Sequence, residues 1–181
     1  MKIKKILTGV VIVLFLIVAG GLIFINIFSK KGLPDYNQKV SIPGLEQKVT
    51  IYRDKYAVPH IYAENEHDLY LATGYCMAQD RMWQMDLIRR VTMGRLSEIF
   101  GEKMLKADRL FRTLDITKKS KLVLAKSSDE LRGHLDAYAQ GVNYYIQEHK
   151  GNFPLEYNIL GYVQDSWEPI HTLNLIGYMA W

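Results

Sequence analysis

The sequence predicts an α+β protein that is mostly helical and is preceded by one transmembrane helix. Three observations support this fold class. A long apolar run lies between lysines at the N-terminus, residues 65–93 carry apolar side chains at helical spacing, and two short β-branched and aromatic segments lie between these regions. We therefore divide the chain into a cytoplasmic basic tip with a transmembrane signal-anchor, residues 1–31, and a body, residues 32–181.

The N-terminal apolar run extends from Ile6 to Phe28 without a charged residue. At about 1.5 Å per residue, it is long enough to cross a bilayer core of about 30 Å. A cleaved signal peptide would have a shorter apolar core followed by an Ala-x-Ala-like site, and the sequence lacks that pattern. The lysines before the run favour a cytoplasmic N-terminus. We expect a single-pass anchor in the cell membrane with an extracytoplasmic body; secretion after signal cleavage is the alternative.

The net charge argues against a nucleic-acid partner. The formal charge is +4 and the pI is about 9.0, but the lysines that flank the anchor account for this excess, namely Lys2, Lys4, Lys5, Lys30 and Lys31. The body has mixed charge and no basic stripe with interleaved aromatic residues. Cys76 is the only cysteine, so the body must be stable without a disulfide, and we interpret this residue as part of the core.

Short strands are expected before the long helix. Residues 49–53 and 59–63 are rich in β-branched and aromatic side chains, and residues 54–57 between them would form the turn of a hairpin. Pro59 should begin its strand because it cannot donate to a ladder. A further short strand is expected at residues 39–42, ended by Pro43 and Gly44.

The long helix should begin after Asn65, which is a suitable N-cap, and end at Gly94. One apolar stripe on it consists of Leu69, Ala72, Cys76, Trp83 and Leu87, and a second side carries Tyr75, Ala78, Met82 and Met85. A helix that is apolar on more than one side is normally buried. Asp80 lies within the first stripe, and a carboxylate there needs a partner because burying a lone charge is costly. We therefore expect Asp80 to bind a basic residue.

Helical spacing predicts further helices at residues 95–100, 104–114, 116–126, 127–149, 154–160 and from 172 onward, with a turn at 165–169. Gly101 and Gly161 should end two of them. Ser127 and Glu130 have the spacing of a capping box, and Thr172 is a plausible cap of the last helix.

Charged residues gather on the second half of the long helix. The cluster contains Asp80, Arg81, Asp86, Arg89 and Arg90, followed by Arg95 and Glu98. Asp86 and Arg90 are at i and i+4, where side chains of a helix meet. An anion-binding or acid–base site is one interpretation. A structural ion-pair network, with Asp80, Arg81, Asp86 and Arg90 as its members, is favoured because no nucleophile is near.

Motifs for other chemistry are missing from the sequence. It contains no Gly-x-Ser-x-Gly elbow, phosphate-binding glycine loop, Cys-x-x-Cys or His-Glu-x-x-His. His60 and His67 are close in sequence, but the first is expected on a strand and the second at a helix start. We therefore expect no metal site, and few catalytic constellations can be built from these residues.

Several motifs occur in an order that resembles the start of the penicillin acylase (penicillin amidase) family. They are Val49-x-Ile51-x-Arg53-Asp54, residues 58–63 (VPHIYA), Asp68-Leu69, Gly74-Tyr75, residues 78–86 (AQDRMWQMD), Arg89-Arg90, residues 94–101 (GRLSEIFG), residues 135–143 (LDAYAQGVN), Pro154-x-Glu156, Leu160-Gly161, Trp167-x-Pro169 and Met179-Ala180-Trp181. The resemblance extends from about residue 40 to the end of the sequence.

The resemblance implies a four-layer αββα fold of the N-terminal-nucleophile hydrolases, of which this chain would form an N-terminal, mostly helical portion. Members are precursors that cleave themselves into an α chain and a β chain. The serine at the start of the β chain attacks the amide, with its own α-amino group as base. Substrates of the family are linear amides such as penicillins, cephalosporin side-chain amides and acyl-homoserine lactones.

The resemblance covers only the first part of such an α chain. The nucleophile serine is usually followed by asparagine, and no Ser-Asn pair occurs here. The expected partners are therefore the remainder of the α chain, the β chain and a small-molecule amide substrate. Met179 would help to line the acyl pocket, whereas the α-chain residues of the calcium site found in some members would lie beyond Trp181. We expect an N-terminal fragment that is inactive alone; the alternative is a non-catalytic, membrane-anchored relic or binding module.

Overall fold

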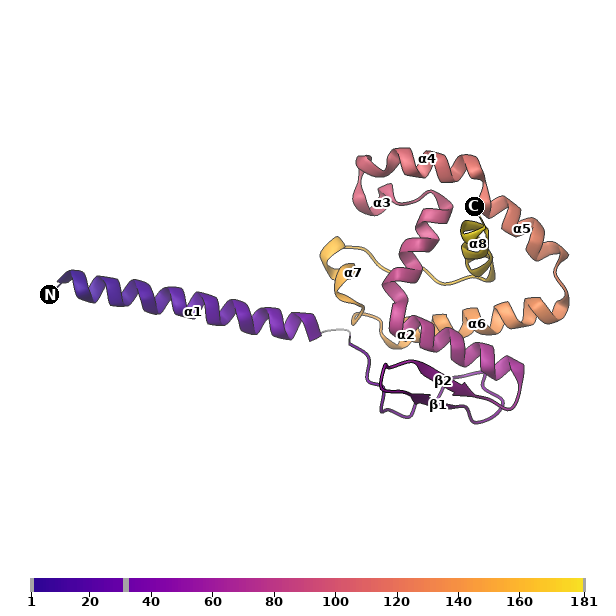
Figure 1. The fold of residues 1–181 in the computed structure, drawn as a ribbon, viewed down its shortest axis with the longest axis horizontal. Coiled ribbons are helices and arrows are strands. Elements are labelled where there is room, and N and C mark those ends of the chain that lie inside the picture. Colours follow the sequence, from indigo (N-terminus) through magenta and orange to yellow (C-terminus); the bar gives the residue numbers. More distant parts are fainter. Residues whose placement is uncertain (1, 31–32, 181) are drawn as a thin grey trace.

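The computed structural model describes residues 2–30 and 33–180, which form helices and one two-stranded sheet (Figure 1). The elements are α1 (Lys2–Lys30), β1 (Thr50–Arg53), β2 (Pro59–Tyr62), α2 (Glu66–Met93), α3 (Ser97–Phe100), the 3-10 helix η1 (Glu102–Met104), α4 (Leu105–Leu114), α5 (Ile116–Lys126), α6 (Asp129–Glu148), α7 (Leu155–Leu160) and α8 (Pro169–Met179). The expected mostly helical body with a small sheet is confirmed. The expected domain boundary at residues 31 and 32 and the terminal Trp181 lie outside the described residues.

Helix α1 contains the predicted apolar run. Its segment Thr8–Asn26 is long and apolar enough to cross a membrane, and the rest of the chain buries none of it. In Figure 1 this helix extends away from the other elements. An N-terminal signal sequence has the same features, so the geometry is compatible with either an anchor or a signal.

The hairpin of β1 and β2 is antiparallel, with Ile51 opposite Ile61. Its turn is held by Asp54, whose Oδ1 accepts hydrogen bonds from Tyr56 N at 2.8 Å and Val58 N at 3.0 Å. The strand expected at residues 39–42 is not formed. This segment lies against α6 instead, where the carbonyl of Ser41 accepts a hydrogen bond from the Tyr144 hydroxyl at 2.8 Å.

Helix α2 begins and ends where the sequence predicts. The Asn65 side chain accepts a hydrogen bond from Asp68 N at 2.7 Å, and Gly94 adopts the left-handed conformation (φ 62°) that closes many helices. The Asp68 carboxylate is fully buried and accepts hydrogen bonds from Glu46 N at 2.9 Å and Gln47 N at 2.7 Å. The first turn of α2 therefore holds the segment that precedes the hairpin.

This buried carboxylate makes stability depend on acid pH. Burial alone would raise the pKa of Asp68, but the hydrogen bonds from Glu46, Gln47, His67 and Asn65 together outweigh burial and hold the pKa below its ordinary value of 3.8. A carboxyl whose pKa is lower in the folded state stabilises it fully above the unfolded pKa, and this contribution is lost as the pH falls through the folded pKa. We expect Asp68→Asn to lower the urea midpoint at about pH 6 and to have a much smaller effect at about pH 3. An equal loss at both pH values would contradict this role.

The body is organised around the crossing of α2 and α6, the most extensive contact between two elements (Figure 1). Two glycines permit the close approach: a Cβ at Gly74 would lie 2.1 Å from the Tyr138 carbonyl oxygen, and a Cβ at Gly141 would lie 1.9 Å from the Leu71 carbonyl oxygen. The core around this crossing comprises Tyr75, Ala78, Met82, Ala139, Val142, Tyr145, Ile146, Phe153, Tyr157 and Trp167. The predicted stripe is buried in part: Ala72 and Cys76 are inside, but Leu69 is exposed.

Two predicted caps are wrong. Ser128, not Ser127, caps α6 and accepts a hydrogen bond from Leu131 N at 3.2 Å, because the Ser127 hydroxyl donates back to the Val123 carbonyl in α5. The predicted turn at residues 165–169 is an extended connection, and α8 begins at its end with Pro169 as first helical residue. Thr172 therefore lies inside α8, where its Oγ1 accepts a hydrogen bond from Trp167 Nε1 at 3.1 Å.

Candidate functional site

The charged side chains of α2 meet around a fully buried carboxylate, Asp86. Its Oδ1 accepts a hydrogen bond from Arg89 Nη2, and its Oδ2 accepts from Arg90 Nε at 3.2 Å and from the Tyr162 hydroxyl at 2.8 Å. Burial, followed by the charge of Asp86, raises the pKa of Tyr162, so this hydroxyl keeps the proton that it donates. Both carboxylate oxygens are thus satisfied inside the protein, as a buried charge requires.

Further charges extend this cluster toward the surface. Glu98 binds Arg90 Nη1 at 2.8 Å and Arg95 Nε at 2.8 Å. The Asp165 carboxylate lies 3.6–3.7 Å from the guanidinium groups of all three arginines, and Arg89 also donates to the Ser166 carbonyl at 3.1 Å. We call this set the Asp86 network; its members are Asp86, Arg89, Arg90, Arg95, Glu98 and Asp165. The three positive and three negative charges of the network balance. The network joins α2, α3 and the connection before α8.

Asp80 and Arg81, which the sequence grouped with Asp86 and Arg90, lie outside this network. Helix α2 loses helical geometry at Arg81 (φ −141°, ψ 23°), so the residues before and after the break do not share one face. As expected, Asp80 has a basic partner, because Arg53 Nη1 of β1 lies 2.8 Å from its Oδ2. The Asp80 side chain nevertheless remains 20% exposed. Arg81 donates to Gln84 Oε1 at 3.1 Å. Sequence reasoning missed Arg53, Tyr162 and Asp165, because no local pattern relates them to α2.

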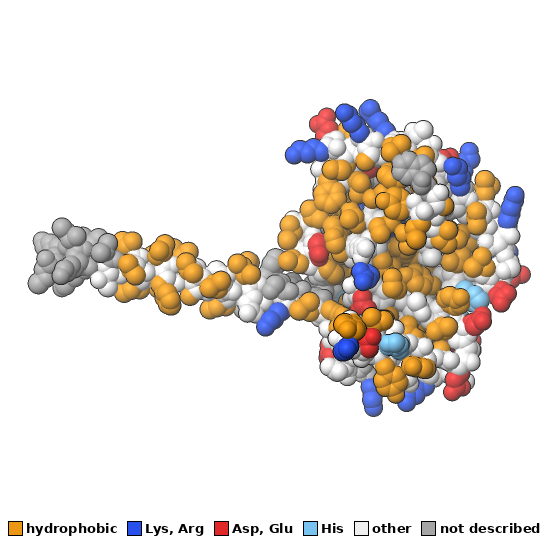
Figure 2. All heavy atoms as spheres, viewed as in Figure 1, with side chains coloured by type: hydrophobic (Ala, Val, Ile, Leu, Met, Phe, Trp, Pro, Cys, Tyr) orange, Lys and Arg blue, Asp and Glu red, His pale blue; other side chains and the backbone are white. Residues whose placement is uncertain are grey.

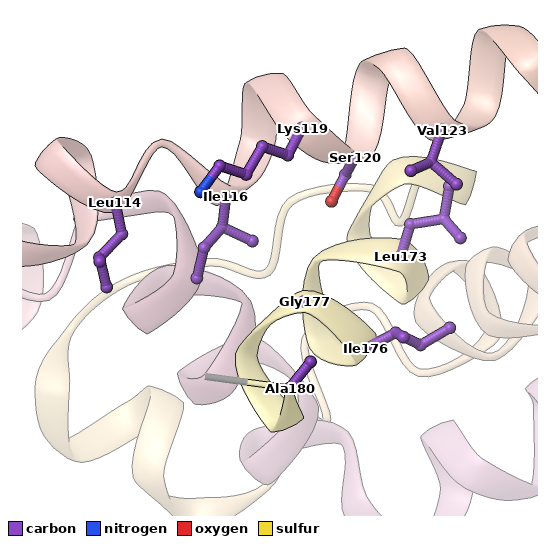
Figure 3. Close-up of a pocket in the computed structure, with 9 residues that line it drawn as sticks. All are labelled: Leu114, Ile116, Lys119, Ser120, Val123, Leu173, Ile176, Gly177 and Ala180. Atoms are coloured by element: carbon purple, nitrogen blue, oxygen red, sulfur yellow. The ribbon is translucent and has the colours of Figure 1, made fainter.

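Met179, the residue expected to contact substrate, is the last residue of α8 and is 78% exposed. Beside this end of α8, a cavity of about 370 Å³ lies between α8, α5 and the end of α4 (Figure 3). Its lining is mostly apolar and consists of Leu114, Ile116, Lys119, Ser120, Val123, Leu173, Ile176, Gly177 and Ala180. Figure 3 shows Val123 and Leu173 pointing toward one another across it. Lys119 and Ser120 are the polar residues of this mostly apolar lining, and the exposed Met179 precedes the lining residue Ala180.

The Cys76 thiol and the described serine hydroxyls lack two usual features of an activated nucleophile, a lowered pKa and a histidine partner. Burial raises the pKa of the Cys76 thiol to about 11, which keeps it protonated and weakly reactive at neutral pH. No described serine side chain is hydrogen-bonded to a histidine, the arrangement that activates a hydroxyl in many hydrolases. His60 and His67 do not meet, since they contact Asp54 and Asp68 respectively.

Among the residues that the structure describes, one group of side chains has metal-ligand spacing. The ligand atoms of Glu66, Glu130 and His134 lie within 4.8 Å of one another at the surface of α2 and α6. Calcium prefers six to eight oxygen ligands. Two exposed carboxylates and an imidazole do not provide such a set, so these residues do not fit a calcium site.

The fold and the charge network define a helical scaffold, and comparison with known proteins identifies its family. The penicillin amidase family matches residues 48–181. The chain is 38% identical over 141 residues to penicillin acylase 2 proenzyme of Pseudomonas sp. (strain SE83), covering 78% of this chain and 18% of the relative. It is 33% identical over 149 residues to penicillin G acylase of Escherichia coli, covering 77% and 18%.

Other relatives act on a different class of amide. The chain is 33% identical over 137 residues to acyl-homoserine lactone acylase QuiP of Pseudomonas aeruginosa, covering 76% of this chain and 16% of that protein. Among solved structures, a thermostable penicillin G acylase from Alcaligenes faecalis matches with a TM-score of 0.68 and 28% identity, covering 75% of this chain and 74% of that chain. The chain belongs to the penicillin amidase family, and it spans less than a fifth of the length of these curated relatives.

Proposed function

We propose that this chain is the N-terminal part of a penicillin-acylase-type amidohydrolase that hydrolyses the linear amide bond of acylated small molecules. The names of the relatives support two substrate classes, β-lactam side-chain amides and acyl-homoserine lactones. The observation that carries the proposal is the family match over residues 48–181, which includes every described element from β1 to α8.

In this proposal the nucleophile serine lies outside these 181 residues, at the start of a β chain released by self-cleavage. Its α-amino group is the base that activates the hydroxyl, and the chain described here supplies scaffold. The chain covers only 16–18% of its relatives, which supports a nucleophile outside these residues. The buried Asp86 network with its balanced charges supports a scaffold role for this chain. We assign Asp86, Arg89 and Arg90 a structural role, and Asp80 a role in holding β1 against α2.

The surface supports contact with a further polypeptide, the remainder of the α chain and the β chain. Figure 2 shows hydrophobic side chains gathered over the viewed face of the body, with basic side chains mainly at its upper and lower rims. On α8, Ile176 is 59% exposed and Met179 is 78% exposed, and the hairpin exposes Tyr52, Tyr56 and Tyr62. Apolar patches of this kind mark interaction surfaces. We propose that Met179 lines the acyl pocket once that surface is covered.

A chimaera tests the proposed function. Residues 48–181 would replace the matching region of the Pseudomonas sp. penicillin acylase 2 proenzyme. We expect the chimaera to cleave itself into two chains and to hydrolyse a chromogenic anilide or an acyl-homoserine lactone. The same chimaera with Asp86→Ala is the matched control and should yield little processed protein. A soluble, protease-resistant precursor that is neither cleaved nor active would instead support a non-catalytic binding module.

We further propose that α1 is an uncleaved single-pass anchor that places the body on the extracytoplasmic side of the cell membrane. An arginine at the centre of a membrane span costs about 2.5–3.5 kcal/mol. We therefore expect the wild-type chain to stay in the membrane pellet after alkaline carbonate extraction, and Leu14→Arg with Ile17→Arg to move it to the soluble fraction. Thr8→Ser is the control. Release of the wild-type chain with a mass that lacks α1 would show a cleaved signal instead.

A further inference from the structure

A second cavity lies between α2, α6 and α8, at the point where α2 breaks. Its volume is about 270 Å³, close to the lower limit of about 300–1,000 Å³ for small-molecule pockets. Most of the wall is apolar and is formed by Met77, Met85, Ile88, Trp167 and Leu175. None of these residues lines the cavity beside Met179. The size and the lining suit one small molecule with an apolar body.

The polar side chains in this wall present hydrogen-bond donors. Burial raises the pKa of Tyr138 to about 12, so its hydroxyl remains protonated. Burial and the charge of Arg89 lower the pKa of His171 to about 4, so its ring is neutral. Because His171 Nδ1 accepts a hydrogen bond from Glu168 N at 2.9 Å, the ring proton is on Nε2.

Two arginines also line the cavity. Arg81 is exposed and donates to Gln84, and no described carboxylate lies within ion-pair distance of it. Arg89 is 2% exposed, and its Nε has no hydrogen-bond partner among the described residues. No aspartate or glutamate is part of the lining. The wall therefore offers positive charge and donors, and it lacks the carboxylates that a cationic ligand would need.

We propose that this cavity binds a small carboxylate with an apolar tail or ring. The apolar part lies among Met77, Met85 and Leu175, and the carboxylate accepts hydrogen bonds from the Arg81 guanidinium at the rim. A guanidinium binds a carboxylate through two parallel N–H donors, and the apolar surroundings strengthen this contact. The cavity and its ligand require no residue that takes part in amide hydrolysis, so binding is independent of the proposed enzyme activity.

The test is a ¹⁹F NMR titration of the full chain, held in lipid nanodiscs, with 4-fluorobenzoate. A molecule of this size should bind saturably with a Kd on the order of 1 mM. Neutral 4-fluorobenzamide should bind about fivefold more weakly, because it lacks the charge that the exposed guanidinium recognises. Empty nanodiscs, titrated in the same way, correct for partition of the probe into lipid.

Variants locate the site. We expect Arg81→Gln to weaken binding about fivefold, because an ion pair at the exposed rim contributes up to about 1 kcal/mol, and Leu175→Trp to abolish binding by filling the cavity. Arg132→Gln, the same change at an exposed arginine that pairs with Asp129 on α6, should leave binding unchanged. Absence of saturable binding would overturn the proposal, and so would equal affinity for 4-fluorobenzamide or an unchanged Kd in Arg81→Gln. Circular dichroism of each variant verifies that the fold is retained.

Discussion

Asp86→Ala should lower the free energy of unfolding of the body by about 3–5 kcal/mol, the usual cost of removing one partner of a buried ion pair. Asp86 is fully buried and binds Arg89, Arg90 and Tyr162. Without its carboxylate, two buried arginines, Arg89 and Arg90, lose a counter-charge that both of them bind. Urea unfolding of the full chain, followed by tryptophan fluorescence, to which the buried Trp167 contributes, measures the effect.

Glu98→Gln is the matched control for Asp86→Ala. Glu98 binds Arg90 and Arg95 in the same network, but its side chain is 44% exposed. Ion pairs at the surface contribute between about 0 and 1 kcal/mol, so the control should change stability by less than about 1 kcal/mol. If both variants lowered the free energy of unfolding by similar amounts, burial of Asp86 would not explain its contribution to stability.

Gly74→Ala and Gly141→Ala should each destabilise the body by about 3 kcal/mol, the upper part of the range for overpacking a core. At both positions the new Cβ would overlap a backbone carbonyl of the opposite helix, that of Tyr138 or that of Leu71. A backbone carbonyl cannot rotate away from the new Cβ as a side chain can, so α2 and α6 must move apart. Because this separation relieves both overlaps, the double variant should lose less than the sum of the two single losses.

Gly133→Ala is the matched control for these glycines. Gly133 also lies in α6, but a Cβ there would meet no atom within 4 Å. Alanine is favoured over glycine in a helix by about 1 kcal/mol, so this change should stabilise the body slightly. Chemical denaturation of the three single variants separates the effect of helix propensity from the effect of backbone overlap. If Gly133→Ala lowered the free energy of unfolding by several kcal/mol, the packing explanation would be contradicted.

Local signals in the sequence predicted much of the fold. Asn65 and Gly94 mark the ends of α2 because a cap and a left-handed glycine act within one turn of the helix. The hairpin follows in the same way from its β-branched residues and the turn at Asp54. The strand expected at residues 39–42 fails because strand formation depends on a distant partner, and the Tyr144 hydroxyl takes the carbonyl of Ser41 instead.

The Asp86 network was only partly accessible from the sequence. The spacing of Asp86 and Arg90 indicates a pair within one helix, and such a pair exists at 3.2 Å. Tyr162, however, is 76 positions from Asp86, and no sequence period relates the two. The break of α2 at Arg81 has no local signal in the sequence, so helical spacing predicts one cluster for Asp80, Arg81 and the residues that the break separates from them.

Turnover by the purified chain tests the central claim most directly, namely that these residues supply scaffold and the nucleophile comes from elsewhere. The full chain in nanodiscs would be incubated at high concentration with a chromogenic anilide and with an acyl-homoserine lactone. We expect no hydrolysis above that of empty nanodiscs. Saturable hydrolysis that a single substitution at a serine, threonine or cysteine of this chain abolishes would contradict it.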